Sequence, residues 1–356
     1  MTGIRIAGTG HYLPGPPLDH DTLRASWSRF SDGLPDRMQD RLLRETGIET
    51  RHFGMDVMTG SPTETNTSMA TVAGRRALAV AGWRPEDVDL LVVTTVVPDQ
   101  LMPPTSTGVQ EALGIRRCTE LEIVGNCSAP YKALWTASNS LRLGASRRAL
   151  VCSAQFVSFL GVPPWSNLSQ VKPHQAQLRR ILSDGAGAIA LEGGEPDSGL
   201  RVWLESPGDG RPPGMELRLG AAHPDILGTF ERGDHHVVQQ TREIRQRALT
   251  DAIDGMARML RELEISPSAI DHFIPEVPSM GFVRLIQPLG AERLGLREDV
   301  WRVALPRIGN VGGAAFLVVL DELARAGALR PGELVCSFAE ESSKWMFAGT
   351  VFRWNP

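Results

Sequence analysis

The sequence predicts an α/β fold made of two similar halves, and three observations lead to this prediction. Strand-like and helix-like patterns alternate along the 356 residues, which is typical of sheets covered by helices. A set of landmarks in the first half recurs in the second half at a nearly constant separation. A strand, a sharp turn and a helix surround Cys127, which places a thiol at the start of a helix.

The internal repeat is the main evidence for two similar halves. Residues 77–93 and 260–275 each read as a helix, a short turn containing proline and a buried strand, with Asp89 and Asp271 in equivalent places. Three further pairs of segments match, namely 113–116 with 294–297, 125–129 with 309–313, and 149–153 with 333–337. All are about 180 positions apart. Two copies are too few for a solenoid, so we expect two halves packed about a pseudo-twofold axis.

The expected elements follow one another in a simple order. We expect a first strand over 1–10, helical turns over the mouth of a site in 14–45, and a helix followed by a strand over 77–93. A strand, a turn and a helix should surround Cys127, and a further strand should lie at 149–153. The rest of the first half should contain an irregular stretch at 155–178 and a buried strand at 181–191, and a crossover at 194–215 should lead into the second half. The chain would therefore divide into an N-terminal half, 1–195, and a C-terminal half, 196–356.

Composition is that of a compact enzyme and excludes several other classes. The chain is 42% hydrophobic with a net charge of −4, so it has no basic field that would attract nucleic acid. No apolar run approaches the roughly 20 residues needed to span a bilayer, and the N-terminus has no signal-peptide pattern. The four cysteines show no metal-ligand spacing, and neither do the histidines. We therefore expect a cytoplasmic protein with reduced thiols, no metal and no membrane or nucleic-acid partner.

Cys127 is the strongest candidate for a chemical role. An apolar strand ends in Gly125-Asn126, and after Pro130 the apolar residues are spaced as in a helix. Backbone N–H groups and the helix dipole favour a thiolate at such a position, which would make Cys127 a nucleophile. The alternative is a small core residue. Cys152 and Cys336 occupy equivalent strand positions in the two halves, and for these we expect a core role.

The order of these landmarks resembles the thiolase superfamily, and within it the β-ketoacyl-acyl-carrier-protein synthase III family. The resemblance includes segments 8–14, 45–52 and 89–95, the turn at Cys127, and segments 183–188 and 309–310. It implies a thiolase-like five-layer αβαβα fold, a homodimer and an active-site cysteine that accepts an acyl group. The donor implied is an acyl-phosphopantetheine thioester, on coenzyme A or an acyl carrier protein, with no bound cofactor. Cys127 stands at the cysteine position, and Asn310 at the position of the family's catalytic asparagine.

The sequence departs from the family where its catalytic histidine stands, because Glu276 occupies that position. The family's neutral His and Asn donate hydrogen bonds to the enolate that forms when a malonyl group loses CO2. An ionised Glu276 would repel that enolate and donate nothing to it, which disfavours decarboxylative condensation. A carboxylate can instead accept a proton from an attacking hydroxyl or amine. Glu276 could also have no role, or act as a protonated donor.

Other positions are weaker candidates. The resemblance suggests a backbone oxyanion donor at Ser342 or Ser343, and a loop whose apolar tip, Leu101 and Met102, closes the acyl pocket of a partner subunit. It places His235 and His236 near the acyl tunnel, where they could contact substrate. The run around His174 resembles the missing histidine motif, but chance similarity on a polar helix is the alternative.

Donor recognition departs as well, because Glu45 and Gly281 stand where the family has arginines for coenzyme A and carrier protein. A carrier-protein donor fits better than coenzyme A. We therefore expect an acyltransferase of specialised metabolism, such as antibiotic biosynthesis, that passes an acyl group from Cys127 to a hydroxyl or amine of a small acceptor without decarboxylation. The alternatives are a condensing enzyme that forms a carbon–carbon bond and a non-catalytic partner subunit with the same fold.

Overall fold

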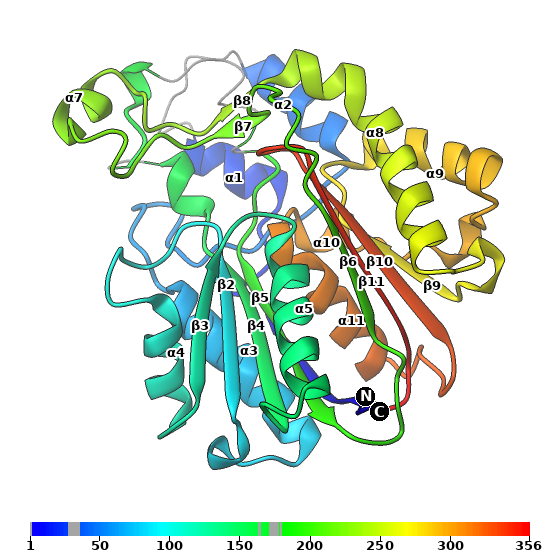
Figure 1. Cartoon of the computed structure of the whole chain (residues 1–356). Coiled ribbons are helices and arrows are strands. Elements are labelled where there is room, and N and C mark those ends of the chain that lie inside the picture. Colours follow the sequence, from blue (N-terminus) through cyan, green and yellow to red (C-terminus); the bar gives the residue numbers. More distant parts are fainter. Residues whose placement is uncertain (1, 28–35, 163–164, 171–177, 179) are drawn as a thin grey trace.

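The computed structural model describes residues 2–27, 36–162, 165–170, 178 and 180–356, and it contains two β-sheets (Figure 1). The first sheet has the strand order β1 (Ile4–Tyr12), β5 (Gly185–Gly193), β4 (Arg148–Gln155), β2 (Leu90–Thr95) and β3 (Thr119–Val124). The second has the order β6 (Arg201–Glu205), β11 (Met346–Arg353), β10 (Leu334–Glu341) and β9 (His272–Pro275). A small two-stranded antiparallel sheet, β7 (Met215–Glu216) and β8 (Val238–Gln239), stands apart from both.

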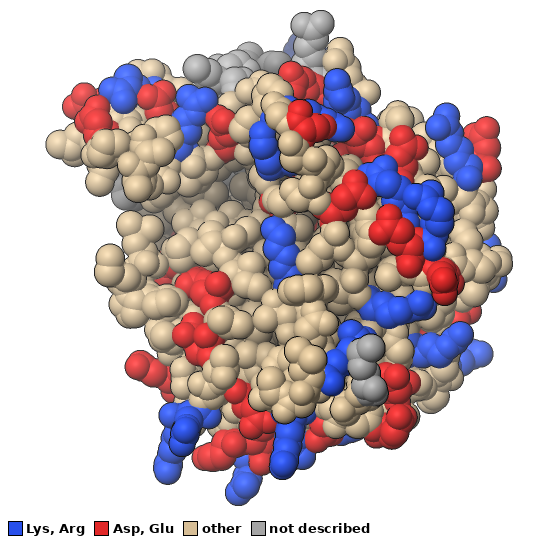
Figure 2. Space-filling model, viewed as in Figure 1, with Lys and Arg blue, Asp and Glu red and all other residues tan. Residues whose placement is uncertain are grey.

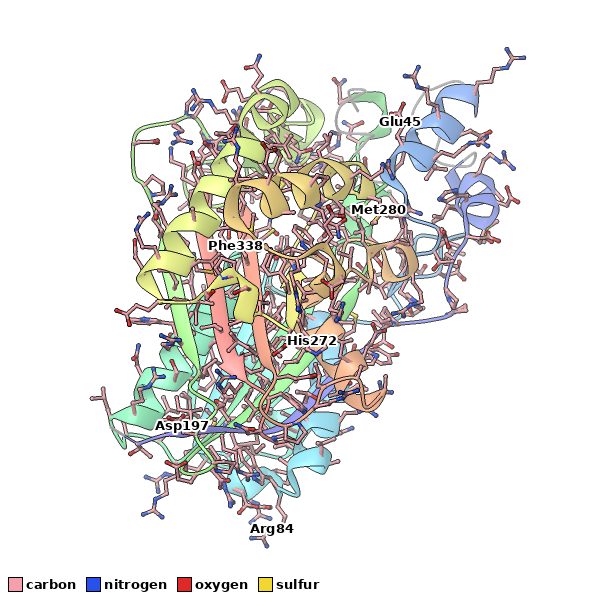
Figure 3. The ribbon with its side chains drawn as sticks, turned by 90° about the vertical axis from the view of Figure 1, so that its right-hand side faces the viewer. Glu45, Arg84, Asp197, His272, Met280 and Phe338 are labelled. Atoms are coloured by element: carbon pink, nitrogen blue, oxygen red, sulfur yellow. The ribbon has the colours of Figure 1, made fainter. Side chains whose placement is uncertain are left out.

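Helices form three layers around the two sheets. The outer layers are α3 (Asn66–Ala81) with α4 (Thr105–Leu113) on the first sheet, and α8 (Thr241–Glu262) with α9 (Met280–Leu294) on the second. Between the sheets lie α5 (Ala129–Arg142) and α11 (Ala315–Arg325). The predicted five-layer αβαβα fold is therefore confirmed. In the sideways view of Figure 3, Phe338 of β10 lies beneath the outer helices of the second sheet.

The hydrophobic core follows these layers because strand side chains alternate between the two faces of a sheet. All six residues of β2 are buried. Leu91 and Val93 pack under α3 and α4, whereas Leu90 and Val92 face the central helices. Each such side chain contributes about 1.5–3 kcal/mol when it leaves water. Strands buried on both faces must be apolar throughout, which explains their near-continuous apolar runs in the sequence.

The predicted duplication is confirmed by the sheet topology. In each half a helix leads through a short 3-10 turn, at Pro85–Asp87 or Pro267–Ala269, into the strand β2 or β9. Asp89 and Asp271 play the same structural role, because each carboxylate accepts backbone N–H groups at the start of the next parallel strand, β4 or β10. Cys152 and Cys336 are buried core residues, as predicted. The expected division at 195/196 falls between β5 and β6.

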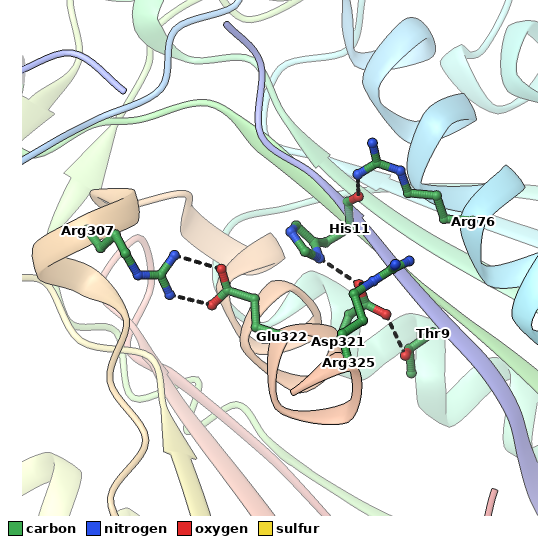
Figure 4. A network of polar contacts seen from close by, with 7 residues as sticks. All are labelled: Thr9, His11, Arg76, Arg307, Asp321, Glu322 and Arg325. Carbon is green, nitrogen blue, oxygen red and sulfur yellow. Dashed lines mark hydrogen bonds and ion pairs between the residues drawn. The ribbon is translucent and has the colours of Figure 1, made fainter. Parts of the chain in front are cut away.

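A buried carboxylate holds the central helix α11 against β1 (Figure 4). Asp321 accepts hydrogen bonds from the Thr9 hydroxyl, at 2.7 Å, and from Arg325, at 2.6 Å, and His11 Nδ1 lies 2.6 Å from its Oδ2. Burial raises the pKa of Asp321, but the contacts with His11, Thr9 and Arg325 outweigh it and hold the pKa below its ordinary value. The Gly-Thr-Gly-His run of the N-terminal strand therefore has a structural role.

The three segments that the sequence marks as irregular contain short helices, 3-10 turns or a strand. Residues 14–45 contain α1 (His20–Trp27) and most of α2 (Asp36–Thr46), in line with the expected helical turns. The predicted crossover at 194–215 was wrong in part, because it contains β6, of whose five residues only Trp203 is fully buried. The stretch 155–178 contains short 3-10 turns, and His174 lies outside the described residues. The remaining helices are α7 (Ile226–Glu231) and α10 (Leu305–Ile308).

Candidate active site

Cys127 lies in the turn between β3 and α5, one residue before the N-cap Ser128. Its thiol donates a weak hydrogen bond to Asn126 Oδ1 at 3.5 Å. The Ser128 N–H donates to Glu341 Oε2 at 2.9 Å, and the Ser128 hydroxyl donates to the same oxygen. The first free N–H group of α5 therefore already donates its hydrogen bond to the Glu341 carboxylate, which comes from the second half of the chain.

Burial and nearby negative charges favour the thiol form of Cys127 over the predicted thiolate. Burial, followed by the negative charges of Glu276 and Glu341, raises the pKa of Cys127 well above its ordinary value. The helix N-terminus does not overcome these effects. For Cys127 to act as a nucleophile, a base would therefore have to take its proton.

Glu276 is the group next to Cys127 that can take this proton. It follows β9, where its N–H donates to the Phe338 carbonyl oxygen at 2.9 Å. Both carboxylate oxygens are buried, and neither accepts a hydrogen bond of normal length and angle from a described residue. Burial raises the pKa of Glu276 to about 7; the nearby Cys127 thiol lowers it and Glu341 raises it. A carboxylate that titrates near neutrality suits a general base.

Asn310 is brought to the same place by a tight contact between the two halves. Its N–H donates to Ile181 O and its carbonyl accepts from Ser183 N, both at 2.9 Å. Gly312 N–H donates to Asn310 Oδ1 at 2.8 Å, so Nδ2 remains as a donor with no acceptor among the described residues. At Gly313 a Cβ would lie 3.0 Å from the Asn126 carbonyl oxygen, which explains the glycine at this approach.

The end of β10 supplies two carboxylates, Glu340 and Glu341, that the sequence analysis did not single out. Consecutive strand residues point to opposite faces, so Glu341 and Glu340 face different layers. Glu341 is buried toward α5, where Ser128 and the Ser343 hydroxyl donate to it. Glu340 is on the face of Phe338, toward α8. Ser342 and Ser343 both line the site, so the predicted backbone oxyanion donor there stays a prediction.

These residues line a cavity of about 350 Å³ formed by both halves of the chain. Its wall includes Cys127, Glu276 and Asn310 together with apolar side chains of α8, α9 and β10. The ionisable side chains among the described lining residues are Cys127 and four carboxylic acids, Glu216, Glu276, Glu340 and Glu341. No lysine, arginine or histidine belongs to this described lining. The cavity is thus apolar and acidic.

The structure does not bring His235 and His236 to the cavity. His235 is buried, with Nε2 2.6 Å from the Trp165 carbonyl oxygen and its ring stacked on Phe230 at 4.6 Å. His236 Nε2 accepts a hydrogen bond from Asn167 N at 2.9 Å. Neither residue lines the cavity. The predicted substrate contacts therefore have no support, because these rings are used in packing the α7 region.

Leu101 and Met102 are exposed, and the closure of a partner's acyl pocket by them stays a prediction. Their side chains are 88% and 83% exposed. Within the described residues, no group of three or more His, Cys, Asp or Glu side chains could hold a metal ion. No helix in that part of the chain is long and apolar enough to cross a membrane.

The chain is similar to known proteins over nearly its whole length. The sequence model of the C-terminal part of 3-oxoacyl-[acyl-carrier-protein] synthase III matches residues 260–354. The β-ketoacyl-[acyl-carrier-protein] synthase III of Erythrobacter litoralis is 29% identical and that of Thioalkalivibrio sulfidiphilus 28%, each over 94% of both chains.

Solved structures agree with this similarity. A tetronic acid condensing enzyme is 26% identical with a TM-score of 0.81, over 98% of this chain and 99% of that one. A priming β-ketosynthase of a polyketide biosynthetic pathway shares the fold with a TM-score of 0.82, at 22% identity over 100% of this chain and 97% of that one. In its five-layer fold and over nearly its whole length, the chain is therefore similar to β-ketoacyl-[acyl-carrier-protein] synthase III, and its C-terminal part matches the model of that family.

Proposed function

We propose that the protein is an acyltransferase of natural-product biosynthesis. It takes an acyl group from a phosphopantetheine thioester onto Cys127 and passes it to a hydroxyl or amine of a small acceptor, without decarboxylation. One observation carries the proposal. Glu276, whose two carboxylate oxygens are buried, lies next to the Cys127 thiol, and each group shifts the pKa of the other.

In the loading step Cys127 needs a base, because its pKa is well above the ordinary value. Glu276 takes the thiol proton as the sulfur attacks the thioester carbonyl carbon. Asn310 Nδ2 and a backbone N–H at Ser342 or Ser343 would stabilise the oxyanion of the tetrahedral intermediate. The carbon–sulfur bond to phosphopantetheine then breaks, and that thiolate takes the proton from Glu276.

The transfer step repeats the same proton movements with the acceptor. Glu276 takes the proton of the hydroxyl or amine as its oxygen or nitrogen attacks the acyl carbon on Cys127. The carbon–sulfur bond breaks, and the Cys127 thiolate recovers a proton from Glu276. One carboxylate serves both steps, and atoms balance without a further reactant.

Decarboxylation of a malonyl group is disfavoured by the charge of the cavity. The malonyl carboxylate and the enolate derived from it are both anionic, and the described lining residues include four acids and no lysine, arginine or histidine. Two like charges about 4 Å apart repel by about 4 kcal/mol at an effective dielectric constant of about 20. An ionised Glu276 would thus oppose the reaction that a neutral histidine assists.

Carbon–carbon condensation is the second candidate function, and the similarity to a tetronic acid condensing enzyme favours it. The two functions are separated by incubating the protein with malonyl carrier protein and measuring the CO2 released. We expect none above the background of the Cys127→Ala variant. Release of CO2 in step with product would establish condensation instead. A non-catalytic subunit, the third possibility, would have no use for a thiol and a base facing one cavity.

The donor that we propose is a carrier protein, which would dock at the surface near Glu45 and Gly281 through a different arginine. These two positions are neighbours: a Cβ at Gly281 would lie 3.7 Å from the Glu45 carbonyl oxygen and 3.8 Å from the Arg284 guanidinium. Figure 3 shows Met280 below Glu45 in the upper part of the molecule. Arg284 is exposed at the start of α9, where it could contact the acidic surface of a carrier protein.

We therefore expect Arg284→Glu to slow the loading of Cys127 from acyl carrier protein by about tenfold, since it reverses one charge of the docking surface. Loading from a free acyl-pantetheine thioester should stay unchanged. Arg293→Glu, an exposed arginine in the last turn of the same helix, is the matched control. If both variants load equally from the carrier protein, docking does not use this edge.

We also propose a homodimer, in which β3 and the loop tip face a second copy. β3 pairs only with β2 and is an edge strand, and the nearby surface carries exposed Leu121, Val124 and Trp135. Figure 2 shows that the surface around α5 is largely uncharged, that acidic side chains lie over β3, and that the surface is hollowed beneath the lobe that holds α7. An exposed apolar patch of this kind beside an open edge strand is typical of an interface.

Light scattering should therefore report a dimer for the wild type at micromolar concentration. Val124→Asp combined with Trp135→Asp should shift the protein toward the monomer, because two buried charges in an apolar interface are costly. Leu143→Asp, an exposed leucine at the other end of α5, should leave the dimer intact. A wild-type monomer would contradict the proposed assembly.

A further inference from the structure

Glu340 is a carboxylate of the cavity wall that the acyl-transfer mechanism does not use. It lies near the end of β10 on the face that packs against α8, opposite to the face on which Glu341 is bound by Ser128. Its Oε1 is buried and has no hydrogen-bond partner among the described residues. A buried carboxylate oxygen without a partner is unfavourable, so a ligand that supplies one would be bound preferentially.

The neighbours of Glu340 do not neutralise it. Asp251 of α8 adds a second negative charge, and Arg211 is the nearby cation. The Arg211 guanidinium, however, already forms ion pairs with Asp251, at 2.9 Å, and with Asp209. The exposed Lys344 donates its hydrogen bond to the Arg211 carbonyl oxygen. Burial, then the charge of Asp251, raises the pKa of Glu340 to about 8 against the opposing effect of Arg211.

The wall between α8 and β10 is suited to an aliphatic chain. Ala248, Ala252 and Met256 recur every fourth residue of α8 and line the cavity with Phe338. Glu276 lines the same cavity, on the face of the second sheet that is turned toward Cys127. An acceptor that fills this space has one acid near the reacting thioester and another along the α8 wall.

We propose that the acceptor carries an ammonium group, which pairs with Glu340 while a hydroxyl or a second amine reaches Glu276 and the acyl group on Cys127. The substrate class is that of small amino alcohols and diamines. This inference rests on the proposed acyl transfer, which left the nature of the acceptor open. The ammonium group takes no part in bond making: the new bond joins the hydroxyl oxygen or the second nitrogen to the acyl carbon, and the proton passes through Glu276 to Cys127.

The test is a binding measurement on the unacylated protein by isothermal titration calorimetry. The probes are ethanolamine, aminobutanol and aminohexanol, with functional groups at the two ends of the chain, each compared with the diol of the same length. We expect at least one amino alcohol to bind about tenfold or more tightly than its diol, since one charge pair in a poorly solvated site discriminates by that order. Binding at pH 7 should release protons with the amino alcohol alone, because an ammonium group favours ionised Glu340.

Glu340→Gln should remove both the preference and the proton release, while Cys127 is still loaded by an acyl donor. Glu216→Gln is the matched control: Glu216 also lines the cavity but already pairs with Arg218 at 2.7 Å, so the preference should persist. Equal affinities for the wild type, no detectable binding of any amino alcohol, or a preference that survives in Glu340→Gln would overturn the inference. Failure of Cys127 to load would instead overturn the acyl-transfer proposal, since the binding measurement needs no thioester chemistry.

Discussion

Cys127→Ala will abolish the acyl-enzyme. Intact-protein mass spectrometry of the wild type after incubation with acyl carrier protein should show a mass increase equal to one acyl group, and the variant should show none. The reason is that the proposed thioester is formed by this sulfur, which lies before α5 in the cavity wall beside Glu276. The expected effect is a complete loss.

The other three cysteines provide the controls. Cys152 and Cys336 are buried in the outer core clusters, where burial raises the pKa of each thiol to about 12. Cys118 is partly exposed and belongs to no cavity wall described above. Alanine at any of these positions should leave the acyl adduct unchanged. An adduct that survives in Cys127→Ala would show that another residue is the nucleophile.

Glu276→Gln will slow acyl transfer by about 10²–10⁴-fold, the usual cost of removing one general base. The glutamine keeps the shape of the side chain but cannot accept a proton. In the wild type the transfer rate should rise with pH through a single group, because only the carboxylate form is a base. The pKa of Glu276 is about 7 with the thiol present. Acylation removes the thiol that lowers this pKa, so the group should titrate at or above that value.

The rate at which Cys127 is alkylated should change in the opposite direction to the transfer rate in Glu276→Gln. The negative charge of Glu276 raises the pKa of Cys127, so its removal lowers that pKa and increases the fraction of thiolate. Alkylation of Cys127 by iodoacetamide, which needs no base in the protein, should therefore be faster in Glu276→Gln than in the wild type at slightly alkaline pH. A variant that is merely misfolded would not combine faster alkylation with slower transfer.

The fold was predictable because its determinants are local and repeated. Strands buried on both faces, such as β2, require continuous apolar runs, and the duplication supplied each pattern twice. The position of Cys127 before a helix followed from the glycine, the proline and the helical spacing around it. The strand β6 escaped prediction because its apolar run, residues 202–204, is only three residues long and lies between charged residues, which is too short to show a strand period.

The electrostatics of the site were not predictable from local sequence. The thiolate expected at Cys127 depends on the helix N-terminus, whereas the raised pKa of the thiol depends on burial and on Glu276 and Glu341, which reach it from distant strands. Glu340 and Glu341 are adjacent in sequence, but only the sheet places them in different layers. The alternation of side chains along a strand would have predicted that Glu340 and Glu341 lie on opposite faces of the sheet.

The central claim is that an acyl group leaves Cys127 for an oxygen or nitrogen acceptor with Glu276 as the base. The most direct test isolates the acylated wild type and acylated Glu276→Gln, which is loaded by prolonged incubation with donor because it lacks the base of the loading step. It then follows, in a single turnover, the loss of the acyl group from the Cys127 peptide when an amino alcohol is added. The account predicts that the wild type transfers the intact acyl group to the acceptor, with a pH-dependent rate, and that the variant holds its acyl group at least about a hundredfold longer. Equal rates in the two proteins would contradict it.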